Sequence, residues 1–236
     1  ELLPQIRDTL PTSTRLVLEA PPGAGKTTQV PPALLDADWL GGRKIVMLEP
    51  RRVAARAAAG FMAKQRGEAV GETVGYRIRF ESRVGRNTRV EVVTEGILTR
   101  IIQHDNALEG IGLLIFDEYH ERSLHADLAL ALSLQVQQVL REDLRILIMS
   151  ATLDGDRLSE TLHAPVIRSS GRQYPVSIQY VPPAQQSAIS REMTKVIRKV
   201  VRETDGDILA FLPGSPEIRQ TTELLQREDL PLVLYP

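Results

Sequence analysis

The chain has 236 residues, of which 42% are hydrophobic and 25% charged, with a formal net charge of -1. These values are ordinary for a globular protein, and a net charge near zero excludes a uniformly basic surface, so any nucleic-acid face must be local. The absence of cysteine excludes disulfides and thiolate metal sites and suits a cytoplasmic protein. No apolar run approaches the ~18 residues of a membrane span, so we expect no membrane partner.

Short apolar runs alternate with alanine-rich or leucine-rich stretches in the first two thirds of the chain. The runs have the length of buried strands, and we expect strands at 16–18, 45–48, 90–94, 113–116 and 146–150. The stretches between them predict helices at 53–63, 96–103 and 128–140. This alternation predicts an α/β fold with a mostly parallel sheet and helices on both faces.

The region 75–94 interrupts this rhythm, because residues 76–80 alternate polar and apolar side chains as a half-buried strand does. A polar, proline-containing stretch at 169–175 predicts a linker between a first domain, 1–168, and a second, 176–236. In the second domain we expect helices at 187–202 and 216–226 and strands at 176–180, 208–212 and 232–235, the last of them cut off by the chain end. The chain begins without Met, and we expect a fragment of a longer protein.

The segment APPGAGKTT at residues 20–28 predicts a phosphate-binding P-loop. Ala20 stands at the first glycine position of the pattern Gly-x4-Gly-Lys-Ser/Thr, but the remaining chemistry is present. Gly23 and Gly25 allow the backbone to curl so that amides point at phosphate oxygens. Lys26 would bridge the β- and γ-phosphates, and the Thr27 hydroxyl would bind Mg²⁺. The nucleotide-binding residues that we expect are Gly23, Ala24, Gly25, Lys26, Thr27 and Thr28. The alternative is a glycine-rich turn before an ordinary helix.

Four apolar residues at 113–116 are followed by Asp117 and Glu118, which is typical of a Walker B strand. Asp117 would lie at the carboxyl end of a strand, where parallel sheets bind ligands, and would hold Mg²⁺. Glu118 would share the Mg²⁺ site and orient or deprotonate the attacking water. The two carboxylates could instead cap the next helix, but a P-loop upstream favours the catalytic interpretation.

Three further side chains are candidates for sensing the nucleotide. His120 lies three residues after Asp117, and Ser150 and Thr152 follow the strand predicted at 146–150. Their hydroxyls could form hydrogen bonds with His120 or Asp117, although Ser and Thr also commonly start helices. The other histidines show no zinc-binding spacing.

Seven segments occur in an order that resembles a known family. They are APPGAGKTT (20–28), PRRVAA (50–55), GYRIRF (75–80), TEGIL (94–98), DEYHER (117–122), SAT (150–152) and FLPG (211–214). Together they resemble the DEAH-box/RHA group of superfamily 2 helicases and are most similar to the bacterial HrpB-type ATP-dependent RNA helicases. The resemblance implies a RecA-like P-loop NTPase domain at 1–168 and the beginning of a second RecA-like domain at 176–236. It also implies ATP, or another nucleoside triphosphate, and Mg²⁺ as cofactors, and Lys26, Asp117, Glu118 and His120 as catalytic residues.

The resemblance also implies a nucleic-acid face formed by Arg51, Arg52, Thr94 and Gly96, which would contact phosphates without reading sequence. An exposed helix start is a fair alternative for the two arginines. The implied partner is single-stranded RNA, with DNA left open, and nothing indicates a protein partner. Rival functions are a DNA helicase or translocase of the same superfamily and a nucleotide-switched RNA clamp that does not unwind.

Two departures from the family pattern are visible. Tyr119 replaces the alanine of Asp-Glu-Ala-His, and we expect it to alter packing and not mechanism. The later segment Gln-x-x-Gly-Arg-x-Gly-Arg, which carries arginine fingers in the family, does not occur in the 236 residues. Such fingers supply about 10³–10⁵ in rate in related NTPases, so we expect the chain alone to bind nucleotide and hydrolyse it slowly.

Overall fold

The structure is a computed structural model that describes residues 2–151, 155–169, 175–182, 187–228 and 230–235. It divides into two compact units, Glu1–Gln173 and Tyr174–Pro236. The unit boundary falls inside the linker predicted at 169–175, of which residues 170–174 lie outside the described residues. None of the described helices is both long enough and apolar enough to cross a bilayer.

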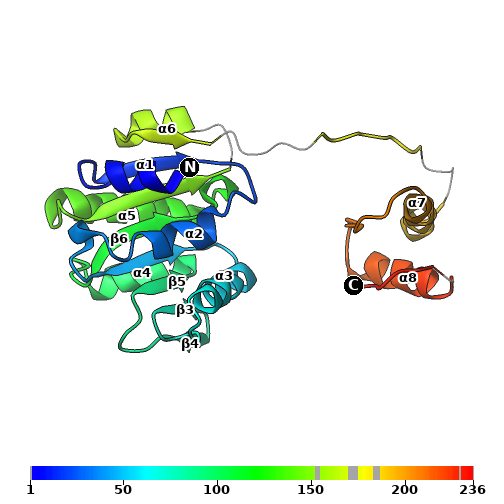
Figure 1. Cartoon of the computed structure of the whole chain (residues 1–236), viewed down its shortest axis with the longest axis horizontal. Coiled ribbons are helices and arrows are strands. Elements are labelled where there is room, and N and C mark those ends of the chain that lie inside the picture. Colours follow the sequence, from blue (N-terminus) through cyan, green and yellow to red (C-terminus); the bar gives the residue numbers. More distant parts are fainter. Residues whose placement is uncertain (1, 152–154, 170–174, 183–186, 229, 236) are drawn as a thin grey trace. The chain divides into compact units, whose positions relative to one another are not determined.

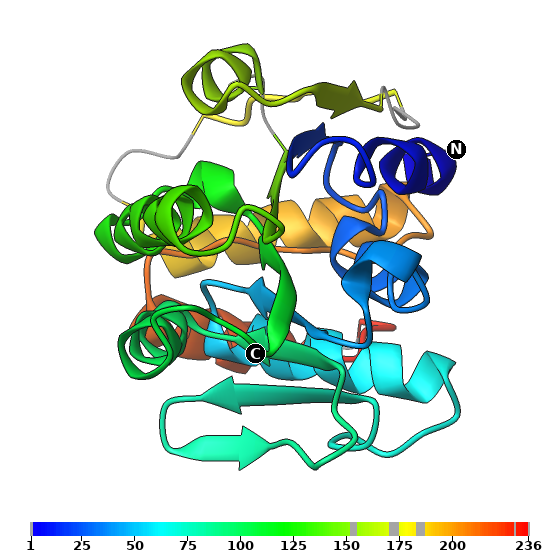
Figure 2. The same ribbon diagram turned by 90° about the vertical axis from the view of Figure 1, so that its left-hand side faces the viewer.

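Among the described residues, eight strands form one sheet in the first unit, in the order β4-β3-β5-β2-β6-β7-β1-β8 (Figure 1). All neighbouring strands are parallel except β3 and β4, which form an antiparallel pair at one end of the sheet (Figure 2). Because β7 alone separates β1 from β6, the carboxyl ends of these three strands meet at one edge. The strands are β1 (Arg15–Glu19), β2 (Lys44–Leu48), β3 (Val74–Ile78), β4 (Glu81–Arg83), β5 (Val90–Val93), β6 (Ile111–Phe116), β7 (Arg145–Ser150) and β8 (Val166–Arg168).

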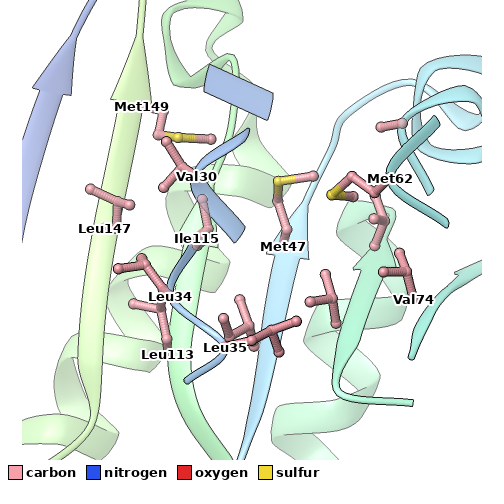
Figure 3. Packing of buried hydrophobic residues seen from close by; sticks show 14 of the residues in the cluster. Val30, Leu34, Leu35, Met47, Met62, Val74, Leu113, Ile115, Leu147 and Met149 are labelled. Carbon is pink, nitrogen blue, oxygen red and sulfur yellow. The ribbon is translucent and has the colours of Figure 1, made fainter. Parts of the chain in front are cut away.

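Helices cover both faces of this sheet, because successive strand residues point to opposite sides. In β1, Leu16 and Leu18 join one core cluster and Val17 joins the other. The first cluster, shown in part in Figure 3, packs under α1 (Leu2–Thr9), α2 (Lys26–Ala33) and α3 (Arg52–Gln65). The second packs under α4 (Glu95–His104), α5 (Leu124–Val139) and α6 (Gly155–Leu162).

This architecture confirms the predicted α/β fold. The five strands and three helices predicted for the first domain are present with small shifts at their ends. The strand predicted at 76–80 ends earlier, at Ile78, because Arg79 and Phe80 form the turn into β4, with Phe80 at a φ of 68°. The short elements α1, α6, β4 and β8 were not predicted.

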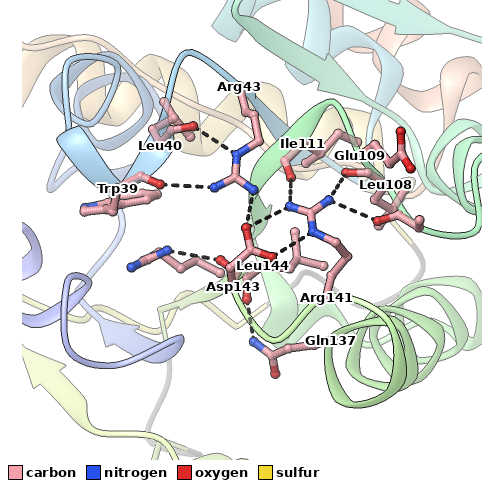
Figure 4. Close-up of polar contacts among 12 residues, drawn as sticks. Trp39, Leu40, Arg43, Leu108, Glu109, Ile111, Gln137, Arg141, Asp143 and Leu144 are labelled. Atoms are coloured by element: carbon pink, nitrogen blue, oxygen red, sulfur yellow. Dashed lines mark hydrogen bonds and ion pairs between the residues drawn. The ribbon is translucent and has the colours of Figure 1, made fainter.

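A network of hydrogen bonds and ion pairs connects the loops at the amino ends of β2, β6 and β7 (Figure 4). The Arg141 guanidinium donates to the carbonyl oxygens of Ala107 at 3.1 Å, Leu108 at 2.8 Å and Ile111 at 3.2 Å. It also pairs with Asp143 at 2.8 Å, and Arg43 pairs with the same carboxylate. The two arginines, Arg141 foremost, hold the pKa of Asp143 below its usual range. One planar cation thus satisfies the carbonyls of the loop before β6.

Replacing Arg141 with methionine is expected to lower the free energy of unfolding by about 2–4 kcal/mol, because three carbonyl acceptors lose their donor. Urea denaturation followed by circular dichroism measures the change. Arg157→Met, at an exposed position on α6, is the matched control and should change stability by less than about 0.5 kcal/mol. Equal stability of the two variants would contradict a structural role for the network.

In its described residues, the second unit contains two helices that pack on each other, α7 (Ile189–Glu203) and α8 (Ser215–Gln226). The Ser190 hydroxyl donates to the Gln220 side chain at 2.8 Å, and Arg198 pairs with Glu228 just after α8. These two elements agree with the helices predicted at 187–202 and 216–226.

The strands predicted in this unit at 176–180, 208–212 and 232–235 are wrong for the structure as described. All three segments lie outside any sheet, and many of their apolar side chains are exposed, including those of Ile178, Phe211 and Val233. Alternating residues and short apolar runs both indicate a chain suited to a sheet, but a strand exists only when a neighbouring strand accepts and donates its backbone hydrogen bonds. Among the described residues of this unit, no such neighbour is present.

Candidate nucleotide site and nucleic-acid face

The predicted P-loop connects β1 to α2 and curls around its own backbone amides. Gly23 and Gly25 have φ values of 78° and 77°, in the left-handed region that favours glycine, and Gly25 caps α2. Among the hydrogen bonds of the described residues, none uses the N–H of Gly23, Gly25, Lys26 or Thr27. These free donors and the amino end of a helix favour an anion.

Lys26 lies at the start of α2 with its side chain turned back into the loop. The residue is 5% exposed, and its Nζ donates to the carbonyl oxygens of Ala20 at 2.7 Å and Pro21 at 3.3 Å. The loop therefore holds the ammonium beside the free amides. A phosphate oxygen at this position would meet both backbone donors and a positive charge.

Asp117 follows β6 directly and faces the P-loop from the same edge of the sheet. It is 1% exposed, its Oδ1 accepts from the Glu118 N–H at 2.9 Å, and its buried Oδ2 has no hydrogen-bond partner among the described residues. Burial raises the pKa of Asp117 to about 6, while the Thr27 hydroxyl and Lys26 lower it. Thr27 and Asp117 thus come together as the sequence predicted.

This donor set fits Mg²⁺ bound together with a nucleotide. An orphaned buried carboxylate oxygen beside a threonine hydroxyl is the kind of hard oxygen donor that Mg²⁺ prefers. Within the described part of the chain, no three His, Asp or Glu side chains form a closed metal cluster. A cation that keeps several waters and binds substrate phosphates needs no such cluster.

Glu49 is a site residue that the sequence reasoning missed. It follows β2 directly, beside β6, and is 2% exposed. Burial, and then the charge of Asp117, raise the pKa of Glu49 to about 7, and its Oε1 accepts from the Arg51 N–H at 3.3 Å. The signal was available, because a carboxylate directly after an apolar run is the pattern that identified Asp117.

Glu118 and His120 occupy a strained turn after β6. Glu118 has a φ of 48°, in the left-handed region that non-glycine residues rarely adopt, and precedes the 3-10 turn η2 (Tyr119–Glu121). The His120 Nδ1 lies 3.3 Å from the Glu118 carboxylate and accepts from the Ala151 N–H at 3.2 Å. The ring nitrogen thus lies between the Glu118 carboxylate and a backbone amide of the segment after β7.

The Ala151 contact joins the turn to the segment after β7 through the backbone. The sequence suggested the hydroxyls of Ser150 and Thr152 for this role. Ser150 is buried at the end of β7, and Thr152 lies outside the described residues. The coupling role of these two residues stays a prediction, whereas the Ala151 amide was not foreseen, because every residue type carries one.

Tyr119, the departure from the family pattern, packs inward. Its ring meets Phe116 edge to face, with centroids 6.3 Å apart, and its hydroxyl donates to the Asp127 Oδ1 at 2.6 Å. Arg122 pairs with the other oxygen of Asp127 at 2.9 Å. Burial and Asp127 raise the pKa of Tyr119. These contacts fasten the turn to α5.

The four residues expected to contact nucleic acid lie at one edge of the sheet. Arg51 and Arg52 stand exposed at the start of α3, after β2, and Thr94 and Gly96 stand at the start of α4, after β5. Because β2 and β5 are parallel neighbours, both helix starts share the edge that carries Asp117. Their binding of nucleic acid stays a prediction.

Two features of this edge suit a phosphate backbone. No acidic residue occurs in the first turn of α3, so the acids near Arg51, Glu49 and Glu121, come from outside the helix. A Cβ added at Gly96 would meet no atom within 4 Å. Packing therefore does not require glycine there, and an open helix surface allows close approach of a ligand.

The parallel sheet, the P-loop and the acid after β6 define a RecA-like P-loop NTPase domain. Residues 4–161 match the family model for the DEAD/DEAH box helicases. The chain belongs to the DEAD/DEAH box helicase family, as the sequence resemblance indicated.

Individual relatives narrow this assignment. The chain is 50% identical over 225 residues to the ATP-dependent RNA helicase HrpB of Escherichia coli K12, covering 95% of the chain and 28% of that protein. It is 38% identical over 218 residues to an HrpA homolog of Haemophilus influenzae, with 91% of the chain and 17% of that protein covered. A crystal structure of the Escherichia coli DEAH/RHA helicase HrpB matches with a TM-score of 0.90 and 49% identity, over 96% of this chain and 29% of that one. The chain thus spans less than a third of the length of these relatives.

Proposed function

We propose that the protein is an ATP-dependent RNA helicase, in which hydrolysis of a nucleoside triphosphate drives movement along single-stranded RNA and separation of a duplex. The buried Oδ2 of Asp117 has no hydrogen-bond partner within the described part of the chain and lies beside Thr27 of the P-loop, and this observation carries the nucleotide part of the proposal. The names of the relatives, which are ATP-dependent RNA helicases, support the RNA part.

Each site residue has a task in this proposal. The loop amides and Lys26 bind the phosphates, and Glu118 orients or deprotonates the attacking water. Thr27, Asp117 and Glu118 would hold Mg²⁺, which supplies positive charge against the transferring phosphoryl group when bound. His120, through Ala151 and the residues Ser150 and Thr152, would report the nucleotide state to the nucleic-acid face.

We also propose a domain division for this function. Residues 1–168 form the first RecA-like domain, 169–175 the linker and 176–236 the beginning of the second. The alternating segment 176–180 and the apolar runs at 208–212 and 232–235 support the assignment of this unit to a second sheet, because both patterns suit strands with neighbours. We assign the protein to the cytoplasm, because the substrate and nucleotide that we propose, RNA and ATP, occur there.

The direct test is strand displacement by the full-length protein on a duplex with a single-stranded RNA tail, with ATP and Mg²⁺. We expect unwinding that needs ATP and a hydrolysis rate that RNA stimulates. Stimulation by single-stranded DNA but not RNA would favour the DNA translocase. Tight, nucleotide-dependent RNA binding without displacement would favour the clamp. No stimulation by either nucleic acid would contradict the proposal.

The nucleic-acid face makes a separate prediction. The double variant Arg51→Ala/Arg52→Ala should bind single-stranded RNA about tenfold more weakly in 0.1 M salt, because two phosphate contacts are lost. Fluorescence anisotropy over a range of salt concentrations should show a log–log salt slope shallower by about 1.4, since each phosphate contact on a single strand contributes about 0.7. An unchanged slope would count against this face.

A further inference from the structure

Two of the contacts that hold the turn carrying Glu118 and His120 differ in their exposure to solvent. On the inner side, Tyr119 is 6% exposed and donates to Asp127 on α5. On the outer side, the Glu121 carboxylate lies 3.2 Å from the Arg51 guanidinium, and these side chains are 38% and 62% exposed. The Tyr119 ring is enclosed, although its acceptor Asp127 is 38% exposed, whereas both side chains of the outer contact are exposed. The buried ring therefore acts as a pivot, and the outer contact is open to competition.

The turn responds to its contacts because its backbone is strained. Glu118 at a φ of 48° and Arg122 at 45° bracket η2, and side chains rarely adopt this region unless surrounding contacts impose it. The Glu121 N–H donates to the Glu118 carbonyl oxygen at 2.9 Å, which closes the turn. A shift of Glu121 is therefore passed on to Glu118.

The structure leaves room for such a shift. A cavity of about 80 Å³ lies beneath the turn, and the residues around it include Pro50, Glu95, Asp117, Glu118 and Glu121. It therefore extends between the nucleotide-site carboxylates and the starts of α3 and α4. A close-packed interior would resist movement of the turn, whereas a cavity beside a strained segment permits a second arrangement.

The Arg51 guanidinium lies 3.2 Å from the Glu121 carboxylate and 3.9 Å from that of Glu49, so the Glu121 contact is the closer of the two. A guanidinium fork binds a carboxylate or a phosphate in the same bidentate geometry, so an RNA phosphate at Arg51 competes with Glu121. We propose that the Arg51–Glu121 ion pair is a latch on the catalytic turn that an RNA phosphate opens. RNA takes Arg51 from Glu121, and the released turn repositions Glu118 for hydrolysis. This inference rests on the proposed RNA contact of Arg51.

Glu121→Gln in the full-length protein tests the latch, because it removes the charge and keeps the shape. We expect RNA-free ATP hydrolysis and RNA affinity each to rise about two- to fivefold, which is what an exposed ion pair is worth, and the RNA stimulation ratio to fall. Higher salt should bring the RNA-free rate of the unaltered protein toward that of the variant, because an exposed pair is screened. Glu68→Gln, which breaks the 3.1 Å pair with Arg66 beyond the other end of α3, is the matched control and should change none of these.

Arg51→Ala breaks the same latch from the other side and separates the two proposals. It should also raise the RNA-free rate, but it should lower RNA affinity, and the double variant Arg51→Ala/Glu121→Gln should be no faster without RNA than either single variant. Additive rate effects, or an RNA-free rate in Glu121→Gln that is unchanged or lower, would overturn the latch even if Arg51→Ala weakens RNA binding. RNA affinity unaltered by Arg51→Ala would instead overturn the RNA face.

Discussion

Lys26→Ala is expected to weaken ATP binding at least 100-fold, to the point where calorimetry detects no heat of binding. Lys26 is the one cation that the structure places inside the P-loop, within the part of the chain that is described, and its Nζ is held by the carbonyl oxygens of Ala20 and Pro21. Charge-assisted hydrogen bonds contribute about 1.5–3 kcal/mol each, and an ammonium that bridges two phosphates makes two of them. The free amides of the loop alone cannot replace that charge.

A loss of ATP binding by Lys26→Ala is informative only if the variant protein is still folded. Alanine removes the donor for two loop carbonyls, so we expect a loss of stability of about 1–2 kcal/mol, measurable by thermal unfolding. Lys64→Ala, at an exposed position on α3, should bind ATP like the unaltered chain. Folded Lys26→Ala protein with ordinary ATP affinity would contradict the P-loop assignment.

Glu118→Gln is expected to slow ATP hydrolysis about 10²–10⁴-fold, the usual contribution of a general base, while ATP affinity stays within about threefold. Glutamine keeps the size and the backbone demands of a residue at a φ of 48°. It removes the carboxylate that lies 3.3 Å from the His120 Nδ1 and directly follows Asp117. A large loss of hydrolysis rate with little loss of ATP affinity identifies a residue that acts on the attacking water.

Single-turnover hydrolysis by the full-length protein, with saturating RNA, measures this effect. Glu109→Gln is a suitable control, since this exposed glutamate lies at the opposite end of β6 from Asp117. Turnover unchanged by Glu118→Gln would reject Glu118 as the water-positioning residue. Loss of ATP binding together with hydrolysis would indicate a role in holding the nucleotide.

Features that depend on residues close together in the sequence could be predicted from the sequence. The P-loop is contiguous, and its glycines, lysine and threonine have their roles because of their order along the chain. Asp117 was found in the same way, from an apolar run that ends in an acid. The parallel sheet with helices on both faces follows from alternating short and long apolar patterns, and the structure confirms it.

Contacts between distant segments were decided only by the tertiary structure. Strand order places β2 beside β6 and β7 between β6 and β1, and this order brings Glu49 to Asp117 and Ala151 to His120. The spacing of apolar residues in the sequence indicates which face of a strand is buried, but it does not indicate which other strand lies beside it. The same limit explains the segment 176–180, whose pattern suits a strand although it has no hydrogen-bonded neighbour in the structure described. The sequence by itself determined the P-loop and the acid that faces it, whereas the path from Arg51 through Glu121 to Glu118 exists only because the folded sheet brings those residues to one edge.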